Sequence, residues 1–140
     1  DEVAGVVLLG GISTNIKDII LWQAKKNKSK VEKELAKISK LPREEMLGID
    51  RPAGRLADEL AMNDNWKYFQ NFKHLPILVL HGDADLEVPS EQAPIWKEKL
   101  GSNRVKCVIK NGKNPLFGDA NNDGADMIAQ EIDDWWIWLK

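Results

Sequence analysis

A short apolar segment that ends in an acidic turn constrains the fold of this chain more than any other feature. The run from Leu75 to Leu80 is followed directly by His81-Gly82-Asp83-Ala84-Asp85. A continuous apolar run of this length, rich in β-favouring residues, predicts a short strand that is buried on both faces, as in a parallel sheet. Open α/β sheets place their functional sites just beyond the carboxyl ends of such strands. Asp85 is therefore the first candidate for chemistry.

Two other segments, Val3 to Leu9 and Arg104 to Ile109, are predicted to join this strand in one sheet. Residues 12–74 hold apolar side chains at helical spacing among many charged ones, which predicts amphipathic helices. A last helix is predicted from about Asp126 to Leu139, with an apolar stripe made of Met127, Ile128, Ile132, Trp135, Trp136 and Leu139. We therefore expect one three-layer α/β domain over residues 1–140. Its short parallel sheet, of about three strands, is flanked by helices, with a helical insertion at about 12–74.

The composition argues against two classes of partner. The chain has 140 residues, of which 43% are hydrophobic and 30% charged, and a formal net charge of −2. Such a chain has no overall attraction for nucleic acid or for an anionic membrane, and no apolar stretch reaches the length of a membrane span. The single Cys107 rules out an internal disulfide and fits a reducing compartment. We therefore expect a cytoplasmic protein that binds neither nucleic acid nor membrane.

The order of these segments resembles the carboxyl-terminal half of an α/β-hydrolase, the fold of many serine esterases and lipases. The resemblance rests on short motifs in five segments. Val3 to Gly11 is similar to the strand after the nucleophile's helix, residues 12–74 to the helical cap, Leu75 to Pro89 to the acid-bearing strand, Asn103 to Ile109 to the last strand, and Asn111 to Gly118 to the histidine loop. The resemblance implies that Asp85 takes the place of the acid in the catalytic triad.

Two features of that family are missing from the sequence. The Gly-x-Ser-x-Gly elbow, which exposes the nucleophile, does not occur. The place of the catalytic histidine falls on Lys113 or Pro115, depending on the gap, and neither side chain serves as an imidazole base. We therefore expect a fragment, a degenerate relative or an engineered miniature that does not hydrolyse esters on its own. The alternative is half of a split carboxylic-ester hydrolase, in which another polypeptide supplies nucleophile and base and Asp85 is the acid.

A second motif predicts a different chemistry. Asp119, Asn121 and Asp123, followed by Gly124, copy the opening of a calcium loop of the EF-hand kind, because hard oxygens at alternate positions and a glycine suit Ca²⁺. The twelfth position, where an acid closes the shell, is Gln130 instead. The alternative is a turn rich in Asp and Asn that caps the last helix. The motif leaves open a calcium-stabilised binding module as a third class of function.

The expected sheet has edge strands that need partners. An edge strand exposes backbone N–H and C=O groups unless another strand or chain covers them. Two copies of the chain can pair their edges into one continuous sheet, or exchange helices, and six tryptophans offer apolar area for such an interface. We therefore expect a homodimer with a scaffold function. A second chain that carries the amino-terminal half of the fold is the alternative partner.

Overall fold

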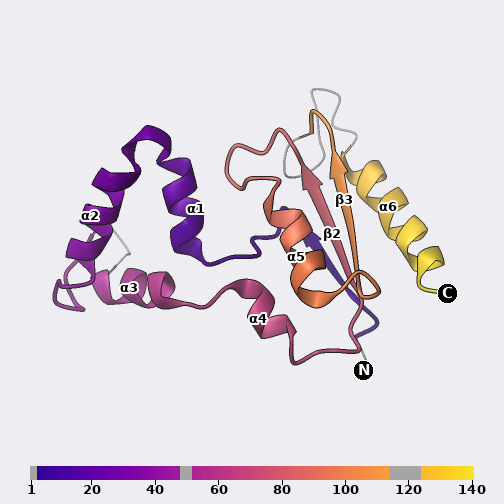
Figure 1. Cartoon of the computed structure of the whole chain (residues 1–140), viewed down its shortest axis with the longest axis horizontal. Coiled ribbons are helices and arrows are strands. Elements are labelled where there is room, and N and C mark those ends of the chain that lie inside the picture. The colour runs from indigo at the N-terminus through magenta and orange to yellow at the C-terminus, as the bar shows by residue number, and fades with distance from the viewer. Residues whose placement is uncertain (1–2, 48–51, 114–123) are drawn as a thin grey trace. The chain divides into compact units, whose positions relative to one another are not determined.

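The computed structural model describes residues 3–47, 52–113 and 124–140, which form helices and one sheet (Figure 1). In chain order the elements are β1 (Val6–Leu9), α1 (Ile16–Gln23), the 3₁₀ helix η1 (Lys25–Asn27), α2 (Lys28–Ile38), α3 (Ala53–Ala61), α4 (Asn65–Phe69), β2 (Ile77–Gly82), α5 (Gln92–Leu100), β3 (Val105–Lys110) and α6 (Gly124–Trp138). The chain divides into two compact units. The sheet unit is Asp1–Ser13 with Asn65–Lys140, and the helical unit is Thr14–Asp64. The helical unit lies within the segment predicted as an insertion.

Three parallel strands form the sheet in the order β1-β2-β3, which confirms the predicted topology. Pairing between β1 and β2 begins at Val6, later than the predicted start at Val3. The reason is Pro76: the Ile77 N–H donates to the β3 side, so position 76 faces β1, where proline has no N–H to offer. At the other end β2 runs on to Gly82, because β3 continues far enough to pair with it.

The sheet unit has three layers because β2 alternates its side chains between two faces. Every residue of β2 is buried. One face packs with α5 in a cluster of Ile77, Val79, Ala93, Trp96 and Val105. The other face packs with α6 in a cluster of Leu78, Leu80 and Trp135. The two helices therefore cover opposite faces of the sheet, as Figure 1 shows, and the three-layer α/β class predicted from the sequence is confirmed.

Helix α6 is apolar on more sides than the sheet covers. The residues that pack on the sheet are Met127, Ile128, Ile132, Trp135 and, just past the helix, Leu139. Trp136, predicted to belong to the same stripe, is 49% exposed, because the 3.6-residue period of a helix turns it away from its neighbour Trp135.

Trp135 packs closely on the segment before β1: a Cβ added at Gly5 would come within 2.5 Å of its ring. Although α6 is strongly apolar, no helix within the described ranges has both the length and the apolarity needed to cross a membrane.

In the helical unit the α-helices α1, α2 and α3 contact one another, and the 3₁₀ helix η1 connects α1 to α2. The Asn15 side chain caps α1 by accepting a hydrogen bond from the Asp18 N–H at 3.0 Å. Near α3, the Arg43 guanidinium donates to both carboxylate oxygens of Asp58 at 3.1 and 2.6 Å, and these hydrogen bonds lower the pKa of that carboxyl. Both partners are exposed to water, so this ion pair orders the surface more than it stabilises the fold.

Candidate functional site

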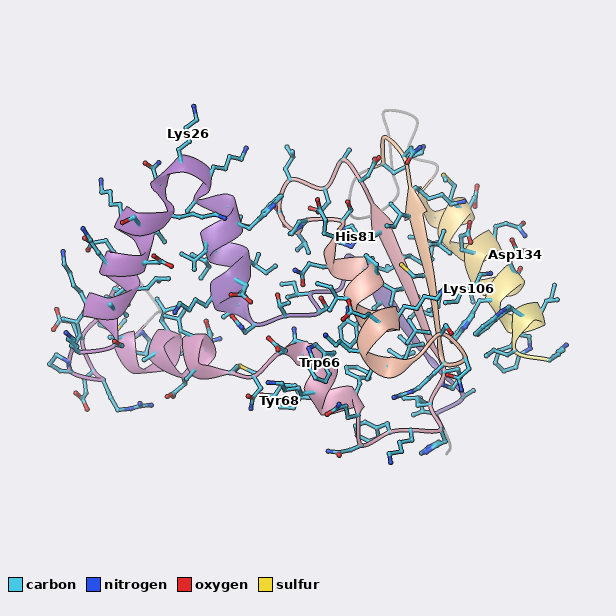
Figure 2. The ribbon with its side chains drawn as sticks, viewed as in Figure 1. Lys26, Trp66, Tyr68, His81, Lys106 and Asp134 are labelled. Atoms are coloured by element: carbon cyan, nitrogen blue, oxygen red, sulfur yellow. The ribbon has the colours of Figure 1, made fainter. Side chains whose placement is uncertain are left out.

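The carboxyl end of β2 carries a buried histidine. The His81 side chain is fully buried between the strand and the segment that leads to α5 (Figure 2). Its Nε2 lies 3.1 Å from the carbonyl oxygen of Val88. A carbonyl oxygen only accepts, so Nε2 carries a hydrogen and donates it. Nδ1 is buried without a hydrogen-bond partner among the described residues.

Asp85 stands in the turn just after β2. One of its oxygens, Oδ1, accepts hydrogen bonds from the backbone N–H groups of Glu87 and Val88 at 2.7 and 2.9 Å. The other, Oδ2, is buried, lies 3.5 Å from His81 Nε2, and has no hydrogen-bond partner in the described part of the chain. That distance is too long for a strong hydrogen bond, and the Nε2 hydrogen already points to Val88. The turn therefore fixes the carboxylate and leaves one of its oxygens without a donor.

The turn that holds Asp85 is tied to the segment after β3. Two backbone hydrogen bonds join them, from the Asp83 N–H to Lys110 O and from the Ala84 N–H to Lys113 O, both 3.0 Å long. The backbone of Lys113, one of the two positions predicted for the histidine slot, therefore lies beside the acidic turn. Pro115, the other position, lies outside the described residues.

A wholly buried serine, Ser13, follows β1 at the same carboxyl end of the strands. The N–H and the Oγ of Ser13 both donate to Oε1 of Gln92, at 3.0 and 2.7 Å. Because its hydroxyl hydrogen goes to an amide oxygen and not to a base, Ser13 links the segment after β1 to the first residue of α5 and is not an activated nucleophile. Sequence reasoning missed this pair, whose members lie 79 positions apart. In the sequence near Ser13, only the pair Gly10-Gly11 indicated that the chain turns sharply after the strand.

The described residues offer little to a metal ion. They contain no group of three or more His, Cys, Asp or Glu side chains arranged to hold one. The residues predicted to bind calcium, Asp119, Asn121 and Asp123, lie outside the described residues. Cys107 is partly buried on β3, and burial raises the pKa of its thiol. A raised pKa favours the protonated thiol, which is the less reactive form.

The carboxyl end of β2 therefore combines an oriented carboxylate, Asp85, with a buried imidazole, His81. Ser13, at the same end of the strands, gives its hydroxyl hydrogen to Gln92 and does not complete a triad with these two groups. Comparison with known proteins gave no match, either to a protein-family model or to a curated protein.

Proposed function

We propose that this chain is a non-catalytic relative of the α/β-hydrolases, located in the cytoplasm, that acts as a scaffold by pairing with a second copy of itself along β1. The observation that carries the proposal is the free edge of this strand. Among the described residues β1 pairs with β2 alone. The N–H groups of Val6 and Gly10 both donate toward β2, so by strand alternation those of Val7 and Leu9 point away from the sheet.

The surface at the start of β1 is apolar. A hollow of about 630 Å³ opens at the start of the strand, and its lining consists of Val3, Val6, Phe72, His74 and Leu75. Val3 and Leu9 are 67% and 42% exposed. A free edge bordered by apolar side chains is the kind of surface that pairs with another strand. A two-fold axis at β1 sets the two strands antiparallel and joins two three-stranded sheets into one.

The dimer is tested by native mass spectrometry and light scattering of the purified chain. We expect a species of twice 15.8 kDa at micromolar concentrations. Leu9→Pro removes the outward-facing N–H without touching a bond to β2, so we expect it to weaken dimerisation by about tenfold or more. Leu9→Ala keeps that N–H and serves as the matched control, for which the dimer should persist.

Two outcomes would contradict the scaffold proposal. One is a wild-type chain that stays monomeric up to about 100 μM, a concentration at which even weak specific pairs associate. The other is a folded Leu9→Pro variant that dimerises as well as the wild type. Circular dichroism of both variants establishes that the sheet unit is intact before the association data are compared.

The second candidate is half of a split carboxylic-ester hydrolase, and the geometry of Asp85 favours it. A triad acid must be held rigidly while one oxygen stays free to accept the N–H of a catalytic histidine. In Asp85 two backbone N–H groups hold Oδ1, and Oδ2 has no donor among the described residues. Because Oδ2 is buried beside His81, this role requires the incoming histidine to displace the His81 imidazole. The nucleophile and the base then come from another polypeptide.

The two candidates differ in what p-nitrophenyl ester hydrolysis should show. A scaffold gives only the background rate, with or without a hydrolase half that carries the serine and histidine, and Asp85→Asn changes nothing. A split hydrolase gains turnover when that half is added, and Asp85→Asn lowers it by about 10³- to 10⁴-fold, because the imidazole loses its orienting acceptor. Turnover that is the same in the wild type and in Asp85→Asn would exclude Asp85 as the triad acid.

A further inference from the structure

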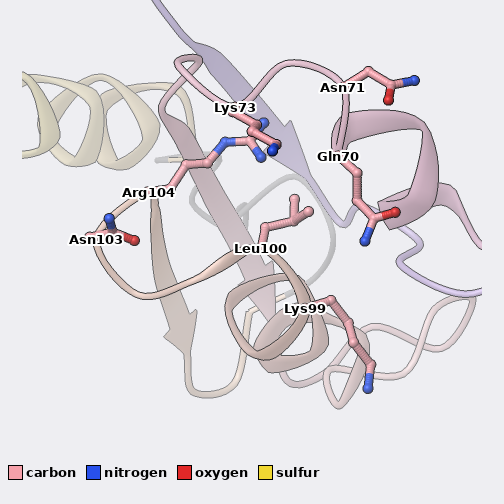
Figure 3. Close-up of a pocket in the computed structure, with 7 residues that line it drawn as sticks. All are labelled: Gln70, Asn71, Lys73, Lys99, Leu100, Asn103 and Arg104. Atoms are coloured by element: carbon pink, nitrogen blue, oxygen red, sulfur yellow. The ribbon is translucent and has the colours of Figure 1, made fainter.

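A basic pocket of about 520 Å³ lies where the chain enters β2 and β3, at the end of the strands opposite to Asp85. Figure 3 shows the residues that line it. The pocket borders the segments that lead into β2 and β3 and the end of α5. Its lining has three cations, Lys73, Lys99 and Arg104, and three side-chain amides, Gln70, Asn71 and Asn103. None of its lining residues is acidic, and the only apolar one is Leu100.

Arg104 is a preorganised donor in this pocket. Its side chain is held by two backbone carbonyls: Nε donates to Leu75 O at 2.8 Å and Nη2 to Phe69 O at 2.9 Å. The residue is only 9% exposed, and none of its hydrogen bonds or ion pairs among the described residues goes to a carboxylate. Burial lowers the pKa of the guanidinium, with no anion to offset it. A guanidinium has five N–H donors, so the two carbonyls leave part of its fork for a ligand.

The two lysines contribute unequally. Lys99 forms an ion pair with Glu98 at 2.7 Å, which offsets much of its charge. Lys73 is exposed at the pocket wall, and no ion pair to it occurs among the described residues. Figure 3 shows Lys73 on the same side of the view as the Arg104 guanidinium, with Gln70 and Asn71 on the other side. The pocket therefore keeps two positive charges that no acidic side chain of its lining balances.

A purely structural role explains only part of this arrangement. The two carbonyl bonds of Arg104 tie the segment before β2 to the start of β3, and they are reason enough for an arginine here. They do not explain why the other residues that line the pocket are cations and amides with no acidic side chain among them. A buried cation without a counter-charge is costly, and an anion in the pocket would relieve that cost.

We propose that this pocket binds a small, hydroxylated phosphate ester of the sugar-phosphate type. The free part of the Arg104 fork and the Lys73 ammonium hold the phosphate, because a guanidinium and an ammonium are the common protein partners of phosphate oxygens. The amides of Gln70, Asn71 and Asn103 both donate and accept, so they suit the hydroxyl groups of the ester. The volume falls in the range of small-molecule sites, and a lining with a single apolar residue gives no surface on which an aromatic base would stack.

Isothermal titration calorimetry with glucose 6-phosphate, inorganic phosphate and glucose tests the proposal. We expect saturable binding of glucose 6-phosphate, weaker binding of inorganic phosphate and none of glucose. Lys73→Gln should weaken glucose 6-phosphate binding by about fivefold through loss of one charge at an exposed wall. Lys26→Gln makes the same charge change on an exposed lysine of the helical unit, and it should leave the affinity unchanged.

Arg104→Lys keeps the charge and removes the fork, so we expect a loss of affinity of about tenfold or more. If Arg104→Lys has a lowered melting temperature or does not fold, Lys73→Gln is sufficient as the test, because the Lys73 side chain makes no structural hydrogen bond among the described residues. The proposal is overturned if glucose 6-phosphate shows no saturable binding up to about 10 mM. It is also overturned if Lys73→Gln and Lys26→Gln change the affinity equally, which would indicate general charge attraction.

Discussion

Replacing Trp96 with alanine is expected to lower the free energy of unfolding by about 3–5 kcal/mol. The indole is 2% exposed and belongs to the cluster between α5 and the sheet. Its ring meets Phe69 edge-on with centroids 5.2 Å apart, and its Nε1 donates to Gly11 O at 3.1 Å. The truncation therefore leaves a cavity, an aromatic ring without its partner and a carbonyl without its donor. A loss of this size approaches the whole stability of a small domain.

Urea unfolding followed by circular dichroism measures this effect, and two variants calibrate it. Trp96→Phe keeps an aromatic ring beside Phe69 but loses the hydrogen bond to Gly11, so we expect a loss of about 1–2 kcal/mol. Trp136→Ala makes the same truncation at a half-exposed tryptophan of α6, where the loss should stay below about 1 kcal/mol. A Trp96→Ala variant as stable as Trp136→Ala would show that the core does not centre on this indole.

The parts of the fold that the sequence predicted correctly are those encoded locally. The strand after Leu75 is a continuous apolar run, and such a run is typical of a strand buried on both faces. Its identity as a strand and its place between two layers of helices could therefore be predicted. The start of β1 was placed too early because its pairing depends on Pro76, some 70 positions away in the chain. The sequence left open which of the adjacent residues Trp135 and Trp136 faces the sheet, because a broad apolar stripe does not decide between them.

In the candidate sites too, the features encoded locally could be predicted and those that depend on distant segments could not. The position of Asp85 after β2 could be predicted because a turn is short and its acid caps nearby N–H groups. The burial of His81 beside that acid, and the link between Ser13 and Gln92, depend on how distant segments meet. Arg104 gave no signal at all in the sequence, because a basic residue before a strand is common. Only its two carbonyl partners and its burial mark it as unusual.

Replacing Asp85 with alanine is expected to lower the free energy of unfolding by about 2–4 kcal/mol, even though the site is not catalytic in the scaffold proposal. The change removes the acceptor of two backbone N–H groups, on Glu87 and Val88, in a turn that is partly shielded from water. The same turn positions Val88 O, which accepts the Nε2 hydrogen of the buried His81. Once the turn loosens, that imidazole loses its only hydrogen-bond partner among the described residues.

Asp85→Asn separates the acceptor role of this side chain from its charge. The asparagine Oδ1 can still accept both backbone N–H groups, but its amide NH₂ then takes the buried place of Oδ2 and faces the His81 Nε2–H, donor against donor. We therefore expect a loss of about 1–2 kcal/mol, smaller than that of alanine. Urea denaturation of both variants under identical conditions gives the comparison. If asparagine costs as much as alanine, the two hydrogen bonds to Oδ1 are not what stabilises this end of the sheet, and the buried Oδ2 beside His81 matters as much. If both variants match the wild type, the two short hydrogen bonds to Oδ1 contribute nothing to folding, and the structural account of Asp85 is wrong.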